Sequence, residues 1–170
     1  MYSGPPIKLA KSPFHDLHTL AQHIQALKQS GNCVVFTNGC FDLLHVGHVH
    51  ILEQARALGD YLIVGINSDT SVRKLKGTTR PIIPETDRGI MLNALKSVDA
   101  VVCFDDDTPV PILKILQPSI HAKGGDYQPQ DLPEYPVVTG YGGRVHCLGF
   151  IPGKSTSAII QRITGITRPD

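Results

Sequence analysis

The stretch Thr37-Asn38-Gly39-Cys40-Phe41-Asp42-Leu43-Leu44-His45-Val46-Gly47-His48, residues 37–48, decides the fold. It follows a short apolar run, residues 33–36, that is typical of a buried strand, and Thr37-Asn38-Gly39 is expected to be the turn that ends this strand. From residue 47 to residue 58 apolar side chains return at helical spacing. A loop between a strand and a helix is where α/β enzymes hold phosphates, so its position predicts an anion site.

The same unit recurs along the chain. Strands are predicted at residues 61–66, 100–104, 119–122 and 145–148, and helices at residues 16–30, 85–95, 110–116 and 156–163. Alternating strands and helices predict an α/β fold, a doubly wound (Rossmann-like) parallel sheet of about five strands with helices on both faces. We expect residues 1–30 to be an N-terminal extension with a packing helix, and residues 31–170 to be one domain. The irregular stretch 124–143 is a candidate substrate loop.

Composition and charge exclude several classes of protein. Lys and Arg number 16 against 15 Asp and Glu, so no global field favours nucleic acid or an acidic membrane surface. The four cysteines lack the spacing of a zinc site or a redox dithiol. No apolar run approaches the ~20 residues that span a bilayer. We therefore expect a cytoplasmic protein without nucleic-acid or membrane partners, whose affinity for phosphate is local.

His45 and His48 stand three residues apart around Gly47, so both imidazoles can face one site at the entrance of a helix. Two alternatives remain for such a pair in isolation: surface residues near a helix start, or half of a metal site. No third or fourth metal ligand lies nearby in the sequence, and Gly39 allows a backbone to approach a ligand closely. This context favours phosphate chemistry.

A basic cluster follows the second predicted strand. Lys74 and Lys76 lie in a predicted loop that continues to Arg80, and Arg88 opens the next predicted helix. A short basic run is often only a solvated surface, and Arg88 at a helix start has the same alternative. The position of the loop beside the first strand favours phosphate binding.

Two further clusters have both structural and functional interpretations. Residues 153–157, Gly-Lys-Ser-Thr-Ser, precede the last predicted helix, where a hydroxyl caps free amides and three hydroxyls also suit triphosphate oxygens. Residues 122–127, Ala-Lys-Gly-Gly-Asp-Tyr, follow a predicted strand and are also compatible with a simple tight turn. Asp42 and Asp99 are expected to brace the structure without touching substrate.

At residues 45–48 the chain resembles the cytidylyltransferase-like nucleotidyltransferase superfamily, whose signature is His-x-Gly-His after a strand and a loop. The resemblance implies that both histidines stabilise the transition state at the α-phosphorus of a nucleoside triphosphate and that residues 37–41 hold its phosphates. It also implies that Lys74 and Lys76 contact phosphates. Such a transfer needs no side-chain nucleophile, because the substrate phosphate is itself the nucleophile.

With Asp105-Asp106-Asp107-Thr108-Pro109, the Lys-Gly-Gly-Asp-Tyr turn and the closing Ser-Thr-Ser, residues 31–163 resemble the heptose 1-phosphate adenylyltransferase family. The resemblance implies transfer of AMP from ATP to D-glycero-D-manno-heptose 1-phosphate, which yields ADP-heptose and pyrophosphate for lipopolysaccharide or surface-glycan synthesis. Relatives are often fused to a sugar kinase, and a stand-alone nucleotidyltransferase domain is expected here. It also implies Mg²⁺ held mainly by the nucleotide, and a homo-oligomer, a dimer or larger.

The resemblance, carried over position by position, gives three groups of site residues. The catalytic residues are His45, His48 and Lys76; the nucleotide-binding residues are Thr37, Asn38, Gly39, Cys40, Phe41, Gly47, Lys123, Gly125, Ser155, Thr156 and Ser157; the substrate-binding residues are Asn38, Lys74, Arg88 and Asp126. No residue is assigned to a protein-held metal. The role of Lys154 stays open, as does the surface on which the first helix packs.

Two alternatives compete with this interpretation. The first is a glycerol- or ethanolamine-phosphate cytidylyltransferase, which shares the His-x-Gly-His loop. The second is a non-catalytic nucleotide-binding module, against which the presence of both histidines, both lysines and all three hydroxyls argues.

Overall fold

The computed structural model describes residues 12–165, which fold around one five-stranded sheet in the order β3-β2-β1-β4-β5. The strands are β1 (Val34–Gly39), β2 (Tyr61–Asn67), β3 (Ala100–Phe104), β4 (Ile120–Gly124) and β5 (Arg144–Leu148), and every pairing is parallel. The strand order reverses between β1 and β4, so the ends of these two strands form the switch point at which such sheets bind ligands. The predicted doubly wound fold is confirmed.

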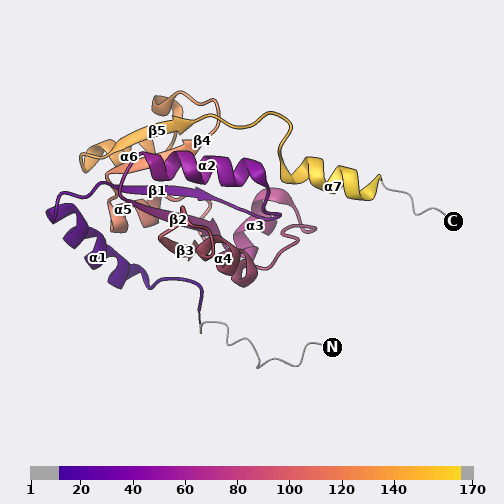
Figure 1. Cartoon of the computed structure of the whole chain (residues 1–170), viewed down its shortest axis with the longest axis horizontal. Helices are drawn as coiled ribbons and strands as arrows, with labels where there is room; N and C mark the ends of the chain where they lie inside the picture. The colour runs from indigo at the N-terminus through magenta and orange to yellow at the C-terminus, as the bar shows by residue number, and fades with distance from the viewer. Residues whose placement is uncertain (1–11, 166–170) are drawn as a thin grey trace.

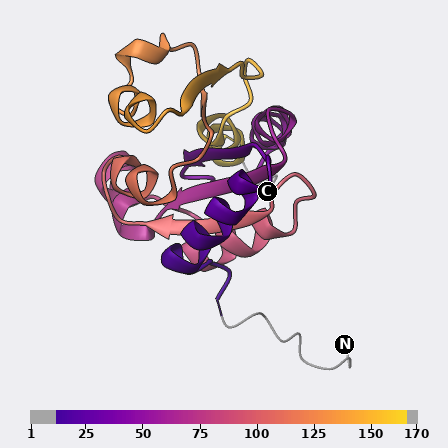
Figure 2. The same cartoon turned by 90° about the vertical axis from the view of Figure 1, so that its left-hand side faces the viewer.

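Helices cover both faces of the sheet (Figures 1 and 2). They are α1 (Leu17–Gln29), α2 (Val46–Ala57), α3 (Asp69–Lys76), α4 (Glu85–Asn93), α5 (Val110–Leu116), α6 (Tyr135–Gly140) and α7 (Thr156–Thr164), with a 3-10 turn η1 (Pro129–Asp131). Helices α2 and α4 bury Leu52 and Leu92 against one face. Helices α1, α5 and α6 bury Ile24, Leu113 and Val138 against the other. Apolar residues alternate along β1, which places Val35 on the first face and Phe36 on the second.

The two terminal helices differ in how they are attached. Helix α1 begins after Asp16, whose carboxylate accepts the backbone N–H of Thr19 at 2.9 Å, and it buries Leu20 and Ile24 in the core of its own chain. Its packing partner, left open by the sequence, is therefore the sheet of the same chain. Helix α7 stands apart from the sheet at the far end of the molecule (Figure 1), and it has no buried residue.

Three local expectations are wrong. Strand β1 continues through Thr37, Asn38 and Gly39, which pair with residues 64–66 of β2, because β2 offers all three residues ladder partners, whereas β4 pairs only as far as Thr37. The basic segment is helix α3 and not a loop, capped by Ser68, whose hydroxyl accepts the backbone N–H of Ser71 at 3.1 Å. The expected irregular stretch 124–143 contains η1 and α6.

Candidate active site

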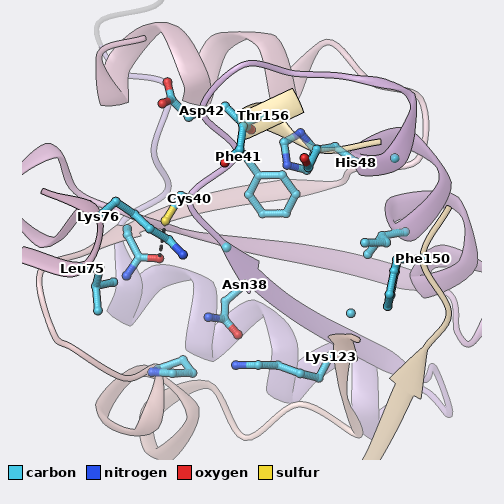
Figure 3. Close-up of a pocket in the computed structure, with 18 of the residues that line it drawn as sticks. Asn38, Cys40, Phe41, Asp42, His48, Leu75, Lys76, Lys123, Phe150 and Thr156 are labelled. Atoms are coloured by element: carbon cyan, nitrogen blue, oxygen red, sulfur yellow. Dashed lines mark hydrogen bonds between the residues drawn. The ribbon is translucent and has the colours of Figure 1, made fainter. Parts of the chain in front are cut away.

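A cavity of about 750 Å³ opens at the carboxyl ends of β1, β2 and β4. Asn38, Asn67 and Lys123 line it from these three strands, and the N-termini of α2 and α7 border it with His48 and Thr156 (Figure 3). The cavity therefore lies at the switch point of the sheet, with two helix N-termini directed at it. Exposed amide N–H groups at a helix N-terminus attract anions.

The two histidines are held as a stacked pair. His45 is the N-cap of α2: its Nδ1 accepts the backbone N–H of His48 at 3.4 Å. Its ring lies 3.8 Å from the ring of His48, centroid to centroid, with an angle of 20° between the planes. A neutral His45 that caps the helix through Nδ1 carries its proton on Nε2, and this atom makes no hydrogen bond to the residues that the structure describes. A Cβ at Gly47 would lie 2.9 Å from the His45 ring and 3.0 Å from the carbonyl of Lys154, which explains the glycine between the histidines.

Both imidazoles are neutral at pH 7 in the protein without ligand. Burial, with the charge of His45 acting in the same direction, lowers the pKa of His48 to about 4. Burial also lowers the pKa of His45. The pair therefore acts as hydrogen-bond donors, and a bound polyphosphate would raise both pKa values by its negative charge.

Asp42 fixes the loop that carries the histidines. It is 1% exposed and accepts the backbone N–H groups of Ile82 and Ile83 at 2.9 and 2.8 Å, and Nε of Arg80 at 2.6 Å. Burial raises the pKa of Asp42, but these hydrogen bonds and the charge of Arg80 outweigh burial and lower it. The bracing role expected for Asp42 is confirmed, and Asp42 also lines the cavity. Its neighbour Phe41 has φ of 47°, a conformation that this brace helps to maintain.

The expectation that Arg88 binds substrate is wrong. Its side chain is fully buried, and its guanidinium donates to the carbonyls of Cys40, Asn67 and Ile83 and to the carboxylate of Asp69 at 2.7 Å. These bonds tie β1, β2 and α4 together behind the site. Sequence could not show this, because three of the four acceptors are backbone carbonyls from separate segments.

Only one of the two lysines of α3 lines the cavity. Lys76, at the end of α3, lines the cavity, whereas Lys74 is exposed and is not part of its wall. Helical geometry explains this, because residues two apart point in different directions from the axis. Gly77, with φ of 94°, ends the helix there.

Ser155, Thr156 and Ser157 all line the cavity. Ser155 is the N-cap of α7, and its hydroxyl accepts the backbone N–H of Ala158 at 3.2 Å. The capping interpretation is therefore confirmed, and the binding of triphosphate oxygens stays a prediction that this position favours. Lys154 also lines the cavity.

The Lys-Gly-Gly-Asp-Tyr turn contributes unevenly. Lys123 lines the cavity and donates to Glu134 at 2.9 Å, and Tyr127 lines it as well. Gly125 and Asp126 are not in the wall. Gly125 has φ of 132° and faces the Tyr127 ring, 2.4 Å from where a Cβ would stand, so its role in this structure is to make the turn.

Most of the predicted residues meet in the cavity. The ones that line it are His45, His48, Lys76, Asn38, Gly39, Cys40, Phe41, Gly47, Lys123, Ser155, Thr156 and Ser157; the ones that do not are Thr37, Gly125, Lys74, Arg88 and Asp126. Thr37 is buried within β1. Sequence reasoning assigned no binding role to Asn67, Arg80, Tyr127, Glu134 and Phe150, which also line it. Of these, Asn67 directly follows a predicted strand, Arg80 lies in the basic cluster and Tyr127 in the Lys-Gly-Gly-Asp-Tyr motif, whereas nothing in the sequence marked Glu134 or Phe150.

Among residues 12–165, no group of three or more His, Cys, Asp or Glu side chains is placed to hold a metal ion. The same part of the chain contains no helix long and apolar enough to cross a membrane. The donors around the cavity are mainly cations, imidazoles and hydroxyls, a set that suits phosphate oxygens better than a bare divalent cation.

Comparison with known proteins identifies a matching family and several similar chains. The model of the cytidylyltransferase-like family matches residues 36–147. The chain is 53% identical over 148 residues to the bifunctional protein HldE of Geotalea uraniireducens, covering 87% of this chain, and 53% identical over 144 residues to HldE of Pelobacter propionicus, covering 85% of this chain. It spans 30% of the length of each of these relatives. A crystal structure of the lipopolysaccharide core biosynthesis protein from Thermoplasma volcanium GSS1 has a TM-score of 0.58 at 26% identity, covering 71% of this chain and 98% of that chain.

Proposed function

The chain belongs to the cytidylyltransferase-like family and is a nucleotidyltransferase, and from this premise we propose that it transfers AMP from ATP to D-glycero-D-manno-heptose 1-phosphate. Three observations support this substrate pair: the Lys-Gly-Gly-Asp-Tyr turn, the identity of about half of its residues with HldE proteins, and the likeness to a lipopolysaccharide core biosynthesis protein. The products are ADP-heptose and pyrophosphate.

The reaction is an in-line displacement at phosphorus. A phosphate oxygen of the sugar phosphate forms a new bond to the α-phosphorus of ATP, the bond from the α-phosphorus to the bridging oxygen breaks, and pyrophosphate leaves with that electron pair. Negative charge builds on the α-phosphoryl oxygens and on the leaving group. Preorganised donors at these two places lower the barrier most.

The residues of the cavity match these two places. Nε2 of His45 and the N-terminal amides of α2 are donors for the α-phosphoryl oxygens. Lys76 and the hydroxyls and amides at the start of α7 border the same cavity and suit the leaving pyrophosphate. The stacked imidazole pair at the N-terminus of α2 is the observation that carries the proposal, because neither a surface role nor a metal site requires it.

We keep Mg²⁺ as part of the proposal. When bound to ATP it neutralises charge on the β- and γ-phosphates. The phosphates themselves would hold it, and Lys76, Lys154 and the α7 N-terminus would bind the remaining phosphate oxygens. The reaction is proposed to occur in the cytoplasm, where ATP is available, and in a homo-oligomer, which sedimentation would test.

Pyrophosphate release tests the substrate assignment. The purified chain is assayed with ATP or CTP, each paired with heptose 1-phosphate, glycerol 3-phosphate or ethanolamine phosphate. Turnover is expected with ATP and heptose 1-phosphate, and omission of Mg²⁺ should suppress it. Efficient turnover of CTP with an alcohol phosphate, and none with ATP and heptose 1-phosphate, would exclude the proposed substrates while leaving the enzyme class intact.

A further inference from the structure

The cavity has a second wall, which lies on the opposite face of the sheet from the histidines. Asn38 is two residues after Phe36 on β1, and Lys123 is two residues after His121 on β4, so both side chains point to the face covered by α5 and α6. Glu134, directly before α6, joins Lys123 at 2.9 Å. In Figure 3, Asn38 and Lys123 lie below the end of β1, whereas Phe41, His48 and Thr156 lie above it.

This second wall contains two buried acceptors without a partner. Glu134 is 2% exposed; its Oε1 accepts from Lys123, and its Oε2 is buried without a hydrogen bond among the described residues. Oδ1 of Asn38 is buried and lacks a partner in the same way. Both residues line the cavity. Buried polar atoms are almost always hydrogen-bonded, so these two oxygens indicate that a ligand supplies donors to them.

The free carboxylate oxygen of Glu134 favours a ligand that donates hydrogen bonds over a phosphate. Burial raises the pKa of Glu134, but the hydrogen bond and charge of Lys123 outweigh it, so the carboxylate is ionised. Burial, and next the charge of Lys123, lowers the pKa of His121, which interacts electrostatically with Glu134, to about 4, so this ring is neutral. A phosphate monoester, with its second pKa of about 6, is mostly a dianion at neutral pH and would be repelled by the carboxylate. Hydroxyl groups donate to a carboxylate strongly.

We propose that Oε2 of Glu134 and Oδ1 of Asn38 form a polyol subsite that binds the hydroxyl groups of a sugar. The reactants of the proposed function, on which this inference rests, carry such hydroxyls in two places, the ribose of ATP and the acceptor sugar. Lys123 is a positioning residue here: it holds Glu134 ionised and turns one of its oxygens away from the ligand. The subsite selects substrates by their hydroxyls, while the His45 wall acts on the phosphates.

The first arm of the test measures nucleotide binding by calorimetry and needs no turnover. The dissociation constants of ATP, 2′-deoxy-ATP, 3′-deoxy-ATP and ITP are compared in the wild type, Glu134→Gln and Asn38→Ala. The second arm compares the KM of heptose 1-phosphate with those of its 2-, 3- and 4-deoxy forms. If the wild type does not turn over heptose 1-phosphate, the proposed function fails, and the second arm is run on the sugar phosphate that it does use.

If the subsite exists, removal of one hydroxyl weakens binding or raises KM about tenfold in the wild type, as loss of a charge-assisted hydrogen bond does. In Glu134→Gln or Asn38→Ala, removal of the same hydroxyl from the ligand should change the dissociation constant or KM less than about threefold. A response to deoxyribose identifies the ribose as the ligand, and a response to the deoxyheptoses identifies the acceptor sugar. Asp131→Asn, an exposed carboxylate outside the cavity wall, is the matched control and should behave as wild type.

Equal discrimination among hydroxyls in the wild type and both variants would overturn the proposal. So would variants that alter only the preference for ATP over ITP, because the acceptors would then bind the base and not a hydroxyl. A thermal melt of each variant establishes that it is folded. Should Glu134→Gln fail to fold, Asn38→Ala removes the other acceptor without disturbing the ion pair.

Discussion

The two walls of the cavity are built by different means. The His45 wall consists of one continuous loop and the start of α2, and its key contacts are a cap from the His45 side chain to the backbone N–H of His48 and the stacking of the two rings. The Glu134 wall joins β4 to the segment before α6 through a buried ion pair. Substitutions in the His45 wall are therefore expected to alter activity without unfolding the protein. In the Glu134 wall, ligand binding and stability both depend on the ion pair between Lys123 and Glu134.

The largest effect is expected at the first wall. His45→Ala and His48→Ala should each lower kcat by about 100-fold or more, as loss of one oxyanion-type donor does. Thermal stability should change little, because the backbone bond from His48 to the carbonyl of His45 remains. Steady-state kinetics beside a melt checks this, with His50→Ala, on the same helix but outside the cavity wall, as control. Normal turnover in both variants would show that the histidines are not catalytic.

Substitutions in the Glu134 wall should lower the free energy of unfolding. Lys123→Ala leaves the buried Glu134 carboxylate without its partner, and we expect a loss of about 2 kcal/mol in the free energy of unfolding, reduced from a fully buried pair because Lys123 is partly exposed. Lys123→Met combined with Glu134→Leu removes both charges and should recover most of that stability. Urea denaturation measures the free energy of unfolding of the wild type, of Lys123→Ala and of the double variant. If the double variant were as unstable as Lys123→Ala, the unpaired charge would not be the cause.

The two lysines of α3 test which residues of this helix belong to the His45 wall. Lys76→Ala should lower kcat/KM about tenfold, the loss of one contact between a cation and a phosphate. Lys74→Ala should stay within about twofold, because the exposed Lys74 does not line the cavity. Kinetics at low and moderate salt compares them, and equal losses in both variants would mean that α3 moves when substrate binds.

The last prediction concerns the dependence of stability on pH. Unfolded His48 takes up a proton near its ordinary pKa of 6.5, whereas in the folded protein its pKa is about 4, so the unfolded state binds more protons between these values. The contribution of His48 to stability is complete above pH 6.5 and is lost as the pH falls to about 4. His48→Gln should therefore lose less stability than the wild type over this interval in denaturation series. Equal losses of stability in the wild type and His48→Gln between pH 6.5 and about 4 would show that His48 does not have this lowered pKa.

The first wall could be predicted from sequence because its parts are contiguous. The loop, the spacing of His45 and His48 and the start of α2 are all set by local patterns, and so are the five strands. Arg88 shows what local patterns omit. It has the appearance of a surface cation at a helix start, yet it is fully buried because carbonyls from distant segments surround it.

Glu134 illustrates the same limit at the second wall. Nothing near it in the sequence indicates burial, since it lies in a stretch rich in proline and acidic residues. Its position depends on Lys123, eleven residues earlier and on β4. Lys74 and Lys76 differ for a simpler reason: the sequence predicts a loop there, whereas the segment is a helix, which turns the two side chains in different directions.

Helix α7 carries the last of the proposed phosphate-binding residues on an element without a fully buried side chain. Its helical state therefore gains little from the core, and its amides are expected to exchange with solvent through local opening, faster than those of α2. A triphosphate bound at its N-terminus would supply the missing stabilisation. Order in this segment would then report whether nucleotide is bound, and slower hydrogen exchange in α7 would give a direct measure of occupancy.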